Sequence, residues 1–219
     1  MRLLLALSIS VLGISAAASG SRVGDGGHGV SCGSSPTVLL DFHEATQGYG
    51  RVPFFDLGAS TEQEYLQTFR DRVSEIMGVN HPSLSIFDQA VSLRYTMWFA
   101  HGPLALTDDI GVLPLVPGHC ILTQVAIRKT GVFNGILEVD ESFWQMATPR
   151  ERALLLVHEG AHGWFAQVGL FEDSAIRQFV GLLYAEGDYG PTSEKIRELI
   201  TSRLPVPSSE LTAAALRER

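Results

Sequence analysis

Residues 148–169 are predicted to form a helix that lies inside the core of a folded domain. The start of this helix carries a capping box, in which Thr148 and Glu151 satisfy each other's free backbone donors. Pro149 stands at the first helical position, where its missing N–H costs nothing. The apolar residues that line the flanks are Leu154, Leu155, Val157, Ala161 and Phe165. We therefore expect the rest of the chain to pack around this helix.

The remaining pattern predicts an α+β fold, in which four or five helices pack against a small antiparallel sheet. Thr61 and Glu64 form a second capping box, and Asn134 with Gly135 supplies the turn of a β-hairpin. Besides the central helix, the predicted elements are helices over 61–78, 83–98, 174–186 and 192–204 and strands over 37–42, 121–129 and 136–140.

The composition indicates a folded chain without a nucleic-acid partner. Hydrophobic residues make up 45% of the 219 residues and charged residues 18%, which excludes disorder for most of the chain. The formal net charge is −8, with 16 Lys and Arg against 24 Asp and Glu. Nucleic-acid binding is not expected, because contact with the phosphate backbone needs clustered positive charge and the sequence has no basic stripe.

Residues 1–18 have the pattern of an export signal that is cleaved after Ala18. Arg2 supplies the positive start, residues 3–14 are mostly apolar, and three alanines end the segment. The apolar run is shorter than the roughly 20 residues that span a bilayer, which favours a cleaved signal over the alternative of an uncleaved anchor. We expect an exported protein, periplasmic or extracellular, with no integral membrane span after cleavage.

The mature chain is expected to hold one domain. Residues 19–35 are rich in glycine and serine, a composition that cannot fill a core, and are predicted to form a flexible arm. The single α+β domain is expected over residues 36–204, followed by a polar tail over 205–219. Cys32 and Cys120 are predicted to form a disulfide, because distant cysteine pairs in exported proteins are typically oxidised. Two free thiols bound to a metal are the alternative.

The central helix contains His158-Glu159-Gly160-Ala161-His162, a match to the pattern His-Glu-x-x-His. Residues four apart lie on one face of a helix, so His158 and His162 can present imidazole nitrogens to one ion. The expected cofactor is Zn²⁺, which lowers the pKa of a bound water to about 7. Glu159 is then the expected general base. The alternative is a pair of histidines bonded to backbone or carboxylate neighbours, with Glu159 solvated.

With this motif on a helix beside a small sheet, the sequence resembles the zincin metallopeptidases. The resemblance covers the motif, the preceding hairpin and the next helix, and it implies a metal-dependent peptidase with a zincin-like active-site helix. Phe165 and Val168 stand where the metzincin subgroup has a glycine and a third histidine, which excludes that subgroup.

Zinc held by two histidines needs a third protein ligand. The resemblance to gluzincins, which take a glutamate from the following helix, implies Glu186, 24 residues beyond His162. If the two helices are antiparallel, however, the residues level with His162 fall around 176–181, where there is no carboxylate. Asp173 is nearer in sequence and is predicted to be the N-cap of that helix instead. Asp188 is a weaker candidate, because a Tyr-Gly pair follows it as in the aspartate-ligand zincins.

The order of signal, glycine-rich arm and the segments 39–44, 136–144 and 173–183 also resembles uncharacterised secreted bacterial proteins. In that type the second histidine position can carry tyrosine, which implies an architectural helix in some members. Two functions are therefore expected. One is an exported zinc-dependent hydrolase, a peptidase or an amidase acting on peptide or peptidoglycan-like amide bonds. The other is a non-catalytic secreted or periplasmic structural or interaction protein.

Overall fold

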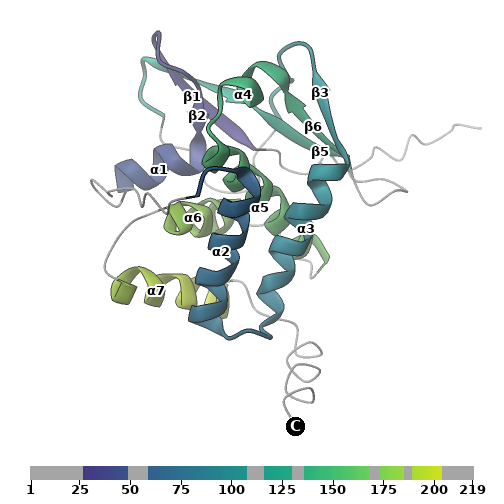
Figure 1. Ribbon diagram of the computed structural model, residues 1–219. Coiled ribbons are helices and arrows are strands. Elements are labelled where there is room, and N and C mark those ends of the chain that lie inside the picture. Colours follow the sequence, from purple (N-terminus) through teal and green to yellow (C-terminus); the bar gives the residue numbers. More distant parts are fainter. Residues whose placement is uncertain are drawn as a thin grey trace, which may run out of the picture.

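Seven α-helices and two three-stranded sheets form the α+β fold of the described residues, with the strands at one end and most helices at the other (Figure 1). The computed structural model describes residues 27–48, 59–107, 116–129, 136–167, 173–184 and 189–203. The elements are β1 (His28–Cys32), β2 (Val38–Leu39), α1 (Leu40–Gly48), α2 (Glu62–Met77), η1 (Pro82–Leu84), α3 (Ser85–Tyr95), β3 (Met97–Ala100), β4 (Cys120–Gln124), β5 (Ala126–Lys129), β6 (Ile136–Asp140), α4 (Glu141–Met146), α5 (Pro149–Gln167), α6 (Asp173–Tyr184), α7 (Tyr189–Glu198) and η2 (Leu199–Arg203).

The α+β class predicted from the sequence is confirmed, with two sheets in place of one. In the first sheet the order is β2-β1-β4 and both pairs are antiparallel. In the second the order is β3-β6-β5, with β5 antiparallel and β3 parallel to β6. The predicted hairpin is therefore confirmed for the pairing of β5 with β6. The segment 121–129 divides at Val125, whose N–H donates to the Gly27 carbonyl oxygen at 3.0 Å.

The capping boxes begin their helices as predicted. The Glu64 N–H donates to Thr61 Oγ1 at 3.2 Å, while Glu64 Oε2 accepts from the Thr61 N–H at 3.0 Å. Helix α2 ends before Gly78, whose φ of +101° lies in the region that favours glycine. The helix predicted over 83–98 ends at Tyr95 instead, and Trp98 belongs to strand β3. A helical spacing of apolar residues cannot by itself locate such a helix-to-strand boundary.

The flexible arm predicted for residues 19–35 is wrong for residues 28–32, which form β1, the central strand of the first sheet. The composition argument fails because glycine lets the backbone pack closely. A Cβ at Gly29 would lie 2.5 Å from Thr37 Cγ2 and 2.7 Å from Val125 Cγ1. The predicted signal at 1–18 and tail at 205–219 lie outside the described residues.

The strand predicted over 37–42 is confirmed only at Val38 and Leu39, since Leu40 begins α1. Leu39 and Leu40 are both buried, and a short apolar run does not distinguish a buried strand from the start of a helix. Helix α1 packs against α6 closely, because a Cβ at Gly181 would lie 3.0 Å from Ala45 Cβ. This contact places α1 beside α6, which contributes to the site described below.

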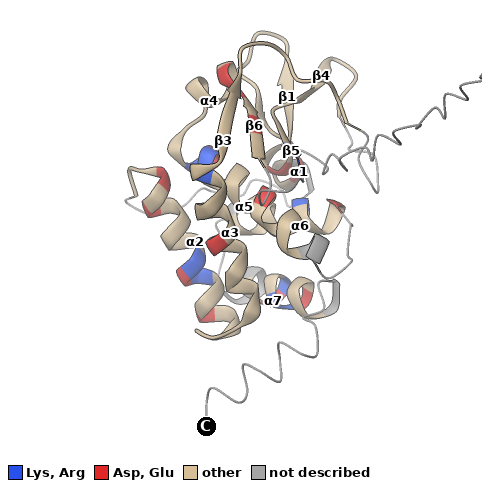
Figure 2. Cartoon of the chain, turned by 90° about the vertical axis from the view of Figure 1, so that its right-hand side faces the viewer, with Lys and Arg blue, Asp and Glu red and all other residues tan. Residues whose placement is uncertain are grey.

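Helix α5 is buried from residue 153 to residue 164, except that His162 is slightly exposed, as the sequence predicts. Its contact with α3 is close at Gly160, where a Cβ would lie 2.5 Å from the Ile86 carbonyl oxygen. Acidic and basic residues are interspersed over the helices in Figure 2, and neither sign gathers on the face shown. Within the described ranges, no helix has the length and apolar character needed to cross a bilayer.

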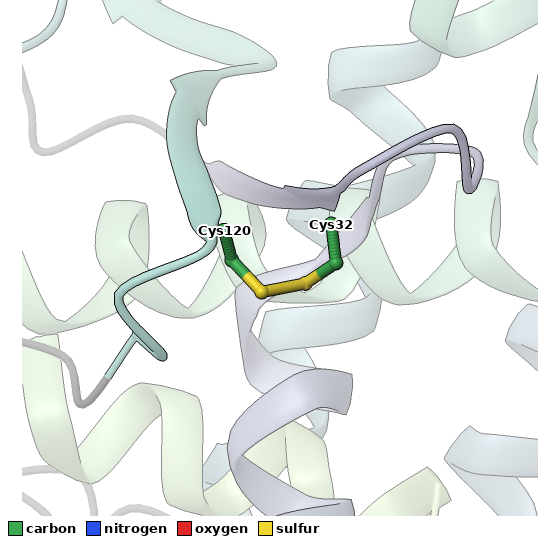
Figure 3. The surroundings of a disulfide bond; sticks show 2 residues. All are labelled: Cys32 and Cys120. Carbon is green, nitrogen blue, oxygen red and sulfur yellow. A yellow bond between two sulfur atoms is a disulfide. The ribbon is translucent and has the colours of Figure 1, made fainter.

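The disulfide predicted between Cys32 and Cys120 is present (Figure 3). The two residues lie directly opposite each other in the antiparallel pair of β1 and β4. The bond therefore ties the first described strand to the middle of the chain.

We expect the double variant Cys32→Ser/Cys120→Ser to unfold at a lower urea concentration than the oxidised protein. The disulfide closes a loop of 88 residues. A loop of this size lowers the entropy of the unfolded chain enough to contribute about 4 kcal/mol to the free energy of unfolding. Urea denaturation followed by circular dichroism measures the difference, with the parent protein in reducing agent as the control. Equal midpoints for the oxidised parent and the variant would contradict the prediction.

Candidate metal centre

Helix α5 brings His158 and His162 together on one face, as their spacing predicts. Their ring centroids are 4.7 Å apart, and the two Nε2 atoms are 3.1 Å apart. The His158 side chain is buried, and that of His162 is 10% exposed. Two imidazole nitrogens therefore point at one another in a nearly dry location.

The third group at this point is Asp173, the first residue of α6. Its Oδ1 lies 2.7 Å from His162 Nε2 and 3.7 Å from His158 Nε2. From the sequence, Asp173 is predicted to be an N-cap in preference to a ligand, and the residues level with His162 are expected three or more positions later. The expected ligand Glu186 lies outside the described residues, as does Asp188.

The three atoms lie close to the spacing of the ligands of a tetrahedral metal ion. His158 Nε2, His162 Nε2 and Asp173 Oδ1 form a triangle with sides of 3.1, 2.7 and 3.7 Å. Ligand atoms about 2.1 Å from a tetrahedral zinc ion lie about 3.4 Å from one another, within the range of these sides. The chemistry of the set, two imidazoles and one carboxylate, is that of a catalytic zinc site with one position left for water or substrate.

Helix α1 holds His158, the first of these candidate ligands, in place. Asp41 Oδ1 lies 2.8 Å from His158 Nδ1, and both side chains are 2% exposed. A proton on Nδ1 shared with Asp41 leaves the Nε2 lone pair directed at the candidate site, which is the arrangement that outer-sphere carboxylates give to metal-binding histidines. No motif links Asp41 to the His-Glu-x-x-His pattern, so the sequence does not identify Asp41 as a site residue.

The Asp41–His158 pair shifts both pKa values. Burial alone would lower the pKa of His158, but the charge and hydrogen bond of Asp41, together with the charge of Glu159, raise it. Burial alone would raise the pKa of Asp41, but the His158 charge and hydrogen bond, with the charge of Arg177, lower it. The surroundings of His158 thus favour positive charge at this point of the core.

The second oxygen of Asp173 is held by Arg177, one turn along α6. Arg177 Nη1 donates to Asp173 Oδ2, and Arg177 Nε donates to Glu44 Oε2 at 2.9 Å. Glu44 lies on α1, the helix that also carries Asp41. Helix α1 therefore orients two of the three candidate ligands, His158 directly and Asp173 through Arg177.

Glu159 is fully buried beside the start of β1. Its Oε1 accepts a hydrogen bond from the Gly27 N–H at 2.7 Å. Its Oε2 is buried and has no hydrogen-bond partner within the described part of the chain. A solvated Glu159, the alternative left open by the sequence, is therefore wrong. A buried carboxylate oxygen without a partner, on the residue that follows His158, is an acceptor suited to a water molecule.

Cys32, His119 and Cys120 form a second cluster of residue types that can bind metals. The two sulfurs are joined in the disulfide and cannot offer thiolates. This finding removes the alternative of two free thiols and leaves the group around His158 as the candidate centre of the described residues.

Comparison of the chain with protein-family models, with characterised proteins and with solved structures gives no match. The interpretation of this site therefore depends on its geometry and chemistry.

Proposed function

We propose that the protein is a zinc-dependent hydrolase that cleaves amide bonds, with His158, His162 and Asp173 as the protein ligands. One observation carries the proposal. His158 Nε2, His162 Nε2 and Asp173 Oδ1 lie 2.7 to 3.7 Å from one another inside the core. Asp173 replaces Glu186 as the proposed third ligand, because it lies in contact with His162. The hydrogen bond between Asp41 and His158 adds support, since metal-binding histidines typically bond a carboxylate through their other ring nitrogen.

Zinc bound at this site would polarise a carbonyl oxygen and lower the pKa of a water molecule. Glu159 is the proposed general base, because its Oε2 lacks a partner among the described residues and lies on the residue next to His158. The Gly27 N–H holds Oε1 and so fixes the orientation of the carboxylate. A proton accepted on Oε2 is then available for the leaving amine.

The proposed substrates are peptide or peptidoglycan-like amides outside the cytoplasm. This assignment depends on the predicted export signal and on the disulfide, which is typical of oxidising compartments. It also depends on the resemblance of the motif helix to that of the zincin metallopeptidases.

One observation favours the rival function, a non-catalytic protein with an architectural helix. The hydrogen bonds of His158 with Asp41, of His162 with Asp173 and of Arg177 with Asp173 form a connected network of protein groups. A satisfied buried network can stabilise a fold by itself. Metal content separates the two functions.

We expect the purified mature protein to hold close to one zinc per chain, and the variant His158→Ala to hold none. Removal of the imidazole deletes one of three proposed ligands. Elemental mass spectrometry measures the content after dialysis with added zinc. His101→Ala is the matched control, because His101 is exposed and pairs with Glu141 away from the cluster. Absence of zinc from the parent after this treatment would favour the architectural function.

A further inference from the structure

Arg128 is a half-buried cation on strand β5, beside the helical turn that carries Glu159 and His162. Its Nη1 donates to the Glu159 carbonyl oxygen at 2.6 Å. Arg70, Arg94 and Arg177 each pair with a carboxylate, whereas Arg128, like Arg152 and Arg197, donates to a backbone carbonyl oxygen within the described ranges. The mechanism proposed above does not use this guanidinium.

The guanidinium of Arg128 packs directly against α5. A Cβ at Gly163 would lie 1.8 Å from Arg128 Nη1, 2.4 Å from its Cζ and 2.3 Å from Gln89 Oε1, so in this arrangement only glycine leaves room for these two side chains. Gly163 follows His162 directly in the sequence, and Glu159 stands one turn before it. The positive group therefore lies along the same flank of α5 as the proposed base.

The donors of Arg128 are incompletely used. A guanidinium has five N–H groups in a planar fork, and within the described ranges one hydrogen bond of Arg128 is formed, to the Glu159 carbonyl oxygen. Arg128 Nε is buried and has no hydrogen-bond partner in this part of the chain. Native proteins rarely keep buried donors unpaired unless a ligand or a water completes them.

The charge of Arg128 persists despite partial burial. Burial lowers the pKa of Arg128, and the Glu159 carboxylate opposes that change. Guanidinium groups remain protonated in proteins, because their ordinary pKa exceeds 12. Arg128 thus offers a positioned positive charge and a fork that matches a carboxylate.

We propose that Arg128 binds a carboxylate of the substrate next to the amide bond that is cleaved. This inference rests on the proposed function, because it names the substrate class of the same site. Two sources share this chemistry, the terminal carboxylate of a peptide and the side chain of an aspartate or glutamate. Either would dock on the guanidinium while the neighbouring amide carbonyl faces His158, His162 and Asp173.

The test measures equilibrium binding, so that it does not depend on turnover. Isothermal titration calorimetry with Glu159→Gln compares an acetylated alanine dipeptide as free acid, the same dipeptide as C-terminal amide, and an amidated dipeptide that ends in glutamate. We expect the free acid or the glutamate peptide to bind at least tenfold more tightly than the neutral amide. Which of the two is preferred identifies the source of the carboxylate.

Three further variants, each combined with Glu159→Gln, assign the preference to Arg128. Arg128→Gln should abolish it, and Arg128→Lys should retain part of it, because the charge remains but the fork is lost. Lys129→Gln should leave it unchanged, because Lys129 is on the same strand, 50% exposed, and paired with Glu138.

Equal affinity for acid and amide peptides, or a preference that survives Arg128→Gln, would overturn the inference. The failure of the proposed function is recognised separately, by a parent protein that holds no zinc. A parent that holds zinc and binds all three peptides equally would contradict the role of Arg128 alone.

Discussion

Replacement of Glu159 by glutamine is expected to lower the rate of amide hydrolysis by about 10²- to 10⁴-fold, the usual contribution of a positioned general base. Glutamine keeps the shape of the side chain and can still accept from the Gly27 N–H, so the local structure should survive. The variant lacks the basic carboxylate oxygen Oε2, which has no hydrogen-bond partner among the described residues. The loss should therefore appear in kcat more than in KM.

Zinc content must be measured on the same preparation of Glu159→Gln. We expect it to equal that of the parent, since Glu159 is not among the proposed ligands. Glu75→Gln is the matched control, because Glu75 is exposed on α2. A Glu159→Gln variant with parental activity and full zinc would exclude the proposed mechanism while leaving the metal site intact.

Replacement of Asp173 by asparagine is expected to weaken zinc binding by more than about 100-fold, the upper end of the effect of losing an outer-sphere contact. The carboxylate Oδ1 is 2.7 Å from His162 Nε2, and its loss removes a charged ligand. Asparagine conserves the volume and can still bond Arg177. Competition with a chromophoric zinc chelator measures the affinity.

Glu186→Gln is the decisive comparison, because Glu186 was the ligand expected from the resemblance to gluzincins. We expect this variant to bind zinc as the parent does. Strong loss of zinc in Glu186→Gln, with retention in Asp173→Asn, would reverse the assignment of the third ligand. Thermal unfolding of both variants shows whether a loss of zinc reflects a loss of fold.

The central helix and its motif could be predicted because their signals are local. The capping box at Thr148, the apolar flanks and the spacing of His158 and His162 lie within one helix, where periodicity determines which residues share a face. The same holds for α2 and its capping box at Thr61. The Cys32–Cys120 disulfide was predictable on other grounds, from the redox compartment.

The groups around the motif could not be predicted, because they depend on how the elements pack. The sequence predicts Asp173 at a helix start, but its side chain meets His162 only because of how α6 packs against α5. Asp41 was assigned to a strand, and so its place on α1 opposite His158 could not be foreseen. The one sequence signal for Asp173 was Arg177, four residues later on the same helix face.

The contacts of residues 27–44 with α5 and α6 have a consequence for the order of folding. Asp41 is 117 residues from His158, Gly27 is 132 residues from Glu159, and Glu44 is 133 residues from Arg177. Contacts of such long range form late, because the intervening chain must first be brought together. A refolding chain should thus acquire its helical signal before its site, and recovery of zinc binding should lag behind recovery of secondary structure.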